Sequence, residues 1–154
     1  MIFDYMEIKI LGDLEWLKIW LENVDDAKLC NMLEEKRGKG RDDFPARVML
    51  NLVYAMKIFG HRSVGSFRRK LSRKSQLRRV CGLKDEGYLY LGKRKTLVPK
   101  ARVVTNFFKS LIECQRQLDC MFEENVKFMY DNLDDFGKDS ALDGKLLDSY
   151  AKKW

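Results

Sequence analysis

Apolar residues recur at spacings of three and four through most of this chain. The pattern is clear near the beginning, where Leu14, Leu17 and Leu21 follow one another at these spacings. Side chains spaced in this way lie on one face of a helix. Only two prolines and ten glycines occur among the 154 residues, so little interrupts the pattern. The sequence therefore predicts a mainly α fold, a helical bundle of about six helices.

Residues that favour helix starts and helix ends divide the bundle into segments. We expect helices near residues 11–21, 25–35, 45–59, 63–71, 75–82, 99–112 and 117–133. Ser63 and Ser75 each precede an apolar run, as N-cap residues do. Gly60 follows a strongly apolar segment and is expected to end that helix.

Burial follows from the same spacing. Met32 and Ile112 are expected to face inward on their helices. The acidic residues of the first 35 positions are expected on the outer face, with Asp25 or Asp26 capping the second helix.

The helical pattern stops between residues 84 and 96. The stretch Gly87-Tyr-Leu-Tyr-Leu-Gly92 is rich in aromatic residues and bounded by glycines. Such a composition suits a short hairpin near residues 86–98, or an irregular loop. The residues alone leave both possibilities open.

Positive charge is concentrated in the middle of the chain. Residues 36–109 hold 21 Lys and Arg against four Asp and Glu, whereas both flanking segments are net acidic. A solvated surface without a partner usually interleaves its charges, and a clustered positive field favours a polyphosphate. Nucleic acid is therefore the expected partner, with an acidic protein or a membrane surface as alternatives.

The cations that we expect to hold nucleic acid form two sets. The first lies on a pair of short helices and comprises Arg68, Arg69, Lys70, Arg73, Lys74, Arg78 and Arg79. The second lies in the following loop and the first turn of the next helix, and comprises Lys93, Arg94, Lys95, Lys100 and Arg102. Tyr88 and Tyr90 are expected to pack against the helices, although they would also suit stacking on unpaired bases.

Three segments, in order, resemble the N-terminal part of bacterial insertion-sequence transposases of the DDE class. They are GRDDFPARVMLNLVYA at residues 40–55, SVGSFRRKLSRKSQLRRVCGL at residues 63–83 and ALDGKLLDSYAK at residues 141–152. No single segment is decisive, but their order and spacing make the resemblance fairly specific.

The resemblance implies a helical, helix-turn-helix-like DNA-binding domain over residues 1–135. Residues 136–154 would then be the start of a ribonuclease-H-like catalytic domain, with an incomplete C-terminal strand. In a helix-turn-helix protein one helix crosses the DNA backbone while the N-terminal residues of another approach base edges. We therefore assign the 68–79 set mainly to phosphates, and Lys100 and Arg102 to the groove.

Asp143 matches the position of the family's first catalytic acid. That chemistry needs three acids to hold two divalent cations, so Asp143 alone is expected to be inert. No cofactor is expected in this chain, and Mg²⁺ only if a complete catalytic domain followed. Without the resemblance, Asp143-Gly144 would read as a turn.

The leading hypothesis is a transposase fragment that binds the ends of an insertion element in double-stranded DNA. Two alternatives stay open: an N-terminal piece of an active metal-dependent DDE transposase, and a basic module that binds RNA or an acidic protein. The resemblance also implies pairing as a homodimer, although the residues leave the oligomeric state open.

The remaining composition indicates a cytoplasmic protein, and the resemblance implies that it is bacterial and nucleoid-associated. The four cysteines contain no Cys-x-x-Cys pair and, with the lone His61, match no zinc-site spacing, so no metal is expected. No apolar run reaches the roughly 20 residues that cross a bilayer, so no membrane is expected as a partner. No acidic or serine partner can be assigned to His61 from the sequence, so it is not expected to act as a catalytic base.

Overall fold

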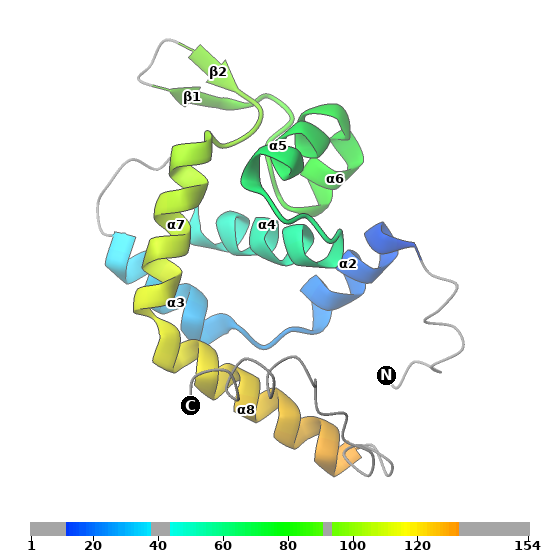
Figure 1. The fold of residues 1–154 in the computed structure, drawn as a ribbon, viewed down its shortest axis with the longest axis vertical. Coiled ribbons are helices and arrows are strands. Elements are labelled where there is room, and N and C mark those ends of the chain that lie inside the picture. The colour runs from blue at the N-terminus through cyan, green and yellow to red at the C-terminus, as the bar shows by residue number, and fades with distance from the viewer. Residues whose placement is uncertain (1–11, 38–43, 91–93, 133–154) are drawn as a thin grey trace, which may run out of the picture. The chain divides into compact units, whose positions relative to one another are not determined.

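A computed structural model describes residues 12–37, 44–90 and 94–132, and confirms the mainly helical fold (Figure 1). The elements in these ranges are α2 (Asp13–Asn23), α3 (Ala27–Arg37), α4 (Ala46–Ile58), α5 (Val64–Arg73), α6 (Ser75–Val80), β1 (Tyr88–Tyr90), β2 (Arg94–Thr96), α7 (Ala101–Glu113) and α8 (Gln115–Asn132). The described residues thus form seven helices and one short hairpin.

The chain divides into two compact units, the first ending at Leu118 and the second beginning at Asp119, inside α8. The first unit holds α2 to α7 and almost all of the buried apolar side chains. The domain boundary predicted between residues 135 and 136 lies outside the described residues. The same is true of the predicted C-terminal strand and of Asp143.

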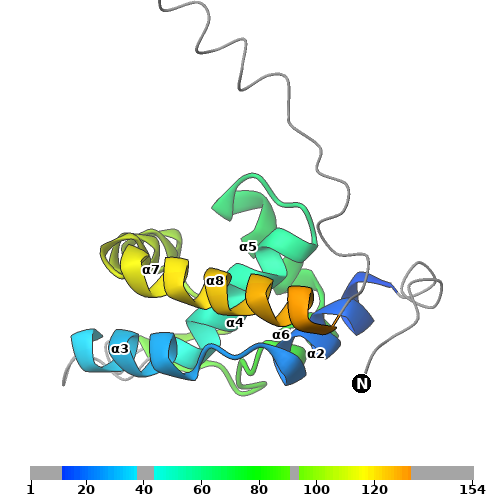
Figure 2. The ribbon, with the colours of Figure 1, turned by 90° about the horizontal axis from the view of Figure 1, so that it is seen from below.

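Helix α4 supplies more of the core of the first unit than any other helix. Its apolar residues recur at helical spacing, and Met49, Leu52 and Ala55 are at most 3% exposed. Helices α2 and α3 pack against α4. The axis of helix α7 crosses those of α3 and α4 at a steep angle. Helix α7 is seen lengthwise in Figure 1 and nearly end-on in Figure 2. Leu71 of α5 joins the same apolar cluster.

Of the boundaries predicted at Gly60, Ser63 and Ser75, the first two are confirmed and the third is wrong. Gly60 follows α4 with a φ of +66°, a left-handed conformation that side chains other than glycine rarely adopt. The Ser63 side chain accepts a hydrogen bond from the Ser66 backbone N–H and caps α5. Ser75 is not a cap: Lys74 occupies the N-cap position of α6, and Ser75 is the first helical residue.

Between α6 and α7 the chain forms the hairpin rather than the irregular loop. Strands β1 and β2 are antiparallel, with Tyr88 opposite Thr96 and Tyr90 opposite Arg94. Gly87 enters the hairpin with a φ of +80°, and a Cβ at this position would lie 3.0 Å from the Thr96 carbonyl oxygen. Glycine is therefore needed here both for its backbone conformation and for space.

Three predictions of burial are wrong. Met32 is 42% exposed and Ile112 is 67% exposed, because the buried faces of their helices centre on neighbouring positions. Asp26 was expected on an acidic outer face, yet it is only 3% exposed. Its carboxylate accepts hydrogen bonds from Arg47 Nη1 at 2.6 Å and from the Tyr54 hydroxyl at 2.8 Å. A buried carboxylate is tolerable when its oxygens have such partners.

Candidate nucleic-acid interface

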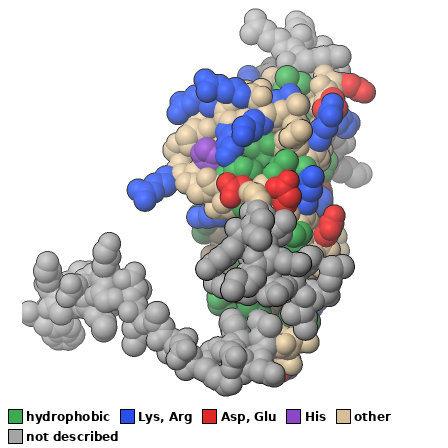
Figure 3. Space-filling view, turned by 90° about the vertical axis from the view of Figure 1, so that its right-hand side faces the viewer, with side chains coloured by type: hydrophobic (Ala, Val, Ile, Leu, Met, Phe, Trp, Pro, Cys, Tyr) green, Lys and Arg blue, Asp and Glu red, His purple; other side chains and the backbone are tan. Residues whose placement is uncertain are grey.

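The predicted cations of α5 and α6 do not share one environment. Phe67 and Leu71 are buried, and of the three residues between them only Arg69 is exposed. Arg69, Arg73 and Lys74 are exposed, and their side chains have no acidic partner among the residues that the structure describes. Figure 3 shows Lys and Arg side chains gathered over the upper part of one face, beside the single histidine, with acidic side chains nearby. These three cations are the ones best placed for phosphates.

Arg68 and Arg78 instead hold the fold together. Arg68 Nε donates a hydrogen bond of 2.7 Å to the carbonyl of Pro99, which fastens α5 to the segment where α7 begins. Arg78 Nη1 donates hydrogen bonds to the carbonyls of Leu71 and Ser72, at 2.7 and 2.9 Å. These two carbonyls in the last turn of α5 thereby gain a donor. Both side chains are half-buried, so only part of each guanidinium is left to face a ligand.

Lys70 and Arg79 are in contact with other side chains. Lys70 Nζ lies 3.7 Å from the centre of the Phe59 ring. Burial, together with the nearby charge of Lys74, lowers the pKa of Lys70. Arg79 forms an ion pair of 2.9 Å with Asp85, in which both side chains are more than half exposed. An exposed pair of this kind contributes at most about 1 kcal/mol, so a phosphate can compete for the arginine.

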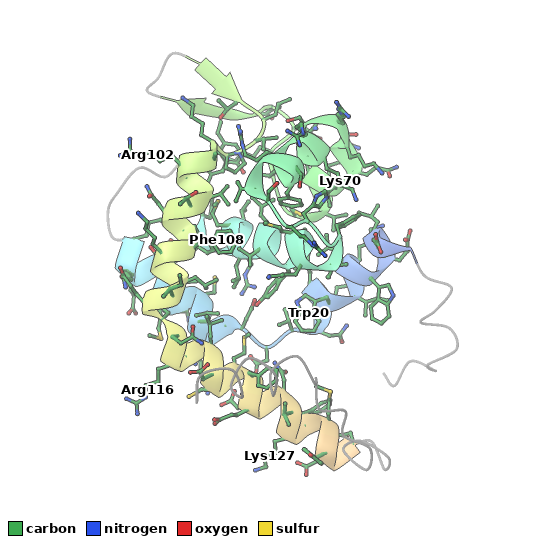
Figure 4. The ribbon with its side chains drawn as sticks, in the orientation of Figure 1. Trp20, Lys70, Arg102, Phe108, Arg116 and Lys127 are labelled. Atoms are coloured by element: carbon green, nitrogen blue, oxygen red, sulfur yellow. The ribbon has the colours of Figure 1, made fainter. Side chains whose placement is uncertain are left out.

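Helix α7 carries a second basic surface at its N-terminal half. Lys100, its N-cap residue, and Arg102 are exposed, and Arg102 extends from the first turn whereas Phe108 points toward the core (Figure 4). Thr105, Asn106 and Lys109 are exposed as well. Residues 102, 105, 106 and 109 are separated by three, four and seven positions, so they share one helical face. We call this face the α7 polar face.

Sequence reasoning missed Thr105, Asn106 and Lys109, although a signal for them was present. Residues 101–112 contain no acid, and polar residues recur there at helical spacing opposite the apolar stripe. Hydrogen-bonding side chains of this kind are suited to base edges and phosphates. The first acid after them is Glu113, one turn beyond Lys109, and it pairs with Lys36.

Other predicted residues lie beyond what the structure describes. Lys93 and Asp143 are outside the described residues, and for Arg94 and Lys95 only the backbone, in β2, is described. Tyr88 packs into the core, as expected: it is 7% exposed and its ring lies 4.3 Å from that of Phe44. Tyr88 therefore does not offer its ring to an unpaired base.

A cavity of about 380 Å³ lies between the end of α3, the start of α4, β2 and α7. Its apolar lining comprises Leu33, Phe44, Ala46, Met49, Val103 and Phe107. Its polar lining comprises Thr96, Asn106 and Ser110, with the cations Arg37, Lys100 and Arg102. Because these residues come from four separate segments, no local pattern in the sequence could have shown the cavity.

Hydrogen bonds from α3 fix the wall of this cavity. Glu34 Oε1 accepts a bond of 2.6 Å from the Ala46 backbone N–H and so caps the start of α4. Arg37 Nη1 donates to the Phe44 carbonyl at 2.9 Å, and Arg37 Nε lies 3.0 Å from Glu34. The start of α4 is thereby held at the end of α3.

The sequence prediction that His61 lacks a serine partner is wrong: His61 Nδ1 lies 2.9 Å from Ser66 Oγ, because the first turn of α5 brings Ser66 beside it. Burial, with a smaller contribution from Lys70, lowers the pKa of His61. Burial raises the pKa of Cys81 to about 12, which keeps it a thiol. Within the described residues, no three His, Cys, Asp or Glu side chains gather in a way that would hold a metal ion.

Comparison with known proteins gives no match: no family model, no curated protein and no solved structure is similar to this chain. The resemblance to transposases therefore depends on the three quoted segments alone and stays a prediction. None of the helices in the described part of the chain combines the length and apolar character that a membrane span requires.

Proposed function

We propose that this chain binds double-stranded DNA, as the binding module of an insertion-element transposase. The observation that carries the proposal is the α7 polar face, on which Arg102, Thr105, Asn106 and Lys109 are exposed with no acid among residues 101–112. Arginine pairs with guanine, asparagine with adenine, and the threonine methyl with thymine, so this set of side chains suits base edges.

The dimensions of the α7 polar face are compatible with a major groove. Residues 102 to 109 span roughly 10 Å of helix at about 1.5 Å per residue. That length corresponds to about three base-pair steps of 3.4 Å. The major groove, about 12 Å wide, admits a helix.

Helices α5 and α6 would contact the DNA backbone. They are joined by Lys74 alone and form the pair for which the resemblance predicts a helix-turn-helix-like unit. The exposed cations of both surfaces are Arg69, Arg73, Lys74, Lys100, Arg102 and Lys109. If all six meet phosphates, log Kd against log salt should have a slope of about 5 in magnitude, and each one that meets a base edge instead lowers this slope by about one.

The test is selection of bound sequences from random duplexes, followed by mobility shift over a salt series with duplex DNA and with RNA. Arg102→Gln should relax the base preference at one position, with a loss of about 1 to 3 kcal/mol there. Arg116→Gln removes the same charge from an exposed position in the first turn of α8 and is the matched control.

Three outcomes would argue against the proposal. RNA bound as tightly as duplex DNA would favour the basic RNA-binding module. A slope of log Kd against log salt near zero would show that the chain makes no phosphate contacts. Equal effects of Arg102→Gln and Arg116→Gln on sequence preference would show that α7 does not read bases.

A further inference from the structure

The cavity beside α7 has the size and lining of a ligand site. Its volume of about 380 Å³ is within the roughly 300–1000 Å³ typical of pockets that hold small organic groups. Met49 is buried in its wall, whereas Phe107 is half-buried and keeps part of its ring accessible. An apolar wall with an accessible aromatic ring suits a flat ring system.

Cations line the cavity. Among the described residues its charged lining side chains are Arg37, Lys100 and Arg102, and Glu34 lies 3.0 Å from Arg37. Glu34 offsets the charge of Arg37, whereas Arg102 is exposed in the first turn of α7 and brings a positive charge to the cavity. A ligand that matches both parts has a flat, largely apolar ring joined to an anionic group, which describes a nucleotide.

We propose that this cavity receives one unpaired nucleotide of the bound DNA. Its base would lie against Phe107, its phosphate beside Arg102, and its polar edge near the Asn106 carboxamide. This inference rests on the proposed function, because Arg102 and Asn106 belong both to the α7 polar face and to the cavity lining. DNA on that face therefore brings a strand to the mouth of the cavity.

Stacking of the unpaired base determines how much more tightly a tailed duplex should bind than a blunt one. Stacking of a base on an aromatic side chain typically strengthens binding by about tenfold or more. A base inside a continuous duplex is already stacked, so it gains little by entering the cavity. The chain should therefore bind a duplex with a single-stranded tail about tenfold more tightly than a blunt duplex of the same sequence.

The experiment measures fluorescence anisotropy with blunt and tailed duplexes for the intact chain and two variants. Ser110→Phe fills the cavity from α7, where the Ser110 hydroxyl donates to the Asn106 carbonyl at 3.3 Å. Ser110→Ala is the matched control, because it removes the same hydroxyl but leaves the cavity open. Circular dichroism checks that both variants fold.

Ser110→Phe should abolish the preference for the tail while keeping the affinity for the blunt duplex, and Ser110→Ala should keep both. As a measurement on the unmutated chain, 2-aminopurine in the tail should change its fluorescence on binding. Equal affinity for tailed and blunt duplexes, with no fluorescence change, would overturn the inference and leave the proposed function standing.

Titration with the four deoxynucleoside monophosphates separates the sources of the ligand. If a monophosphate binds and Ser110→Phe blocks it, but the chain ignores the tail, the cavity serves a free nucleotide and the DNA assignment is wrong. Binding of a monophosphate with no binding of either duplex would instead overturn the proposed function.

Discussion

Arg68 and Arg69 are adjacent and chemically identical, yet they have different surroundings. Arg68 Nε donates a hydrogen bond of 2.7 Å to Pro99, a residue that is almost fully buried. Arg69 is exposed and has no acidic partner among the described residues. Replacing each arginine with methionine keeps much of the apolar stem and removes the same charge, so the two variants form a matched pair.

We expect Arg68→Met to lower the free energy of unfolding by about 2 kcal/mol, the typical value for a hydrogen bond to a charged group whose loss leaves a buried carbonyl unpaired. For a unit of about 100 residues this corresponds to a fall in Tm of roughly 8 to 16 °C. Arg69→Met should change the free energy of unfolding by no more than about 0.5 kcal/mol.

Binding should separate the two variants in the opposite sense. Arg69→Met should reduce the salt slope of duplex binding by about one, because one phosphate contact is lost. Arg68→Met should keep that slope at temperatures where it is folded. Urea unfolding and a salt series of mobility shifts measure these effects. Equal stability of the two variants would refute the assignment of Arg68 to the fold.

Three further matched predictions follow from the described contacts. Asp26→Ala should destabilise the chain by about 2 to 3 kcal/mol in urea unfolding, because it leaves its arginine and tyrosine partners unpaired, whereas Asp25→Ala, an exposed neighbour, should have little effect. Ser63→Ala should cost about 1 kcal/mol by the same assay and Ser75→Ala much less, since only Ser63 caps a helix. The pKa of Cys81 is raised from 9.0 to about 12 in the folded state, so its stabilising contribution is complete below pH 9 and is lost as the pH rises toward 12. Over that range the slope of the free energy of unfolding against pH should be shallower by up to about 1.4 kcal/mol per pH unit in the Cys81→Ala variant. An unchanged slope would contradict the raised pKa of Cys81.

The helices were predictable because each depends on local spacing. The cap at Ser63 and the end of α4 at Gly60 are likewise decided by a few neighbouring residues. The failures depend on contacts across the fold. Asp26 is buried because Arg47 and Tyr54, more than 20 residues away in sequence, bring donors to it, and no local pattern shows that.

The candidate site shows the same division. A run of cations was visible in the sequence, but its members cannot be told apart by spacing alone. Arg68 differs from Arg69 only because the carbonyl of Pro99 lies within reach of one of them. The α7 polar face could have been found, because Thr105 and Asn106 lie opposite an apolar stripe. The cavity could not, since its walls come from four segments.

The bond from Arg68 to Pro99 has a consequence for recognition. Contacts to phosphates supply affinity, whereas contacts to base edges supply sequence preference. Here the two sets of contacts would come from different helices, α5 and α7, which are fastened at the residue just before Lys100. If α7 were loosely attached, the phosphate contacts of α5 would hold the DNA without fixing where Arg102 meets it. A cation that is kept away from the DNA can therefore contribute to specificity, by fixing the register between the helix that grips the backbone and the helix that faces the bases.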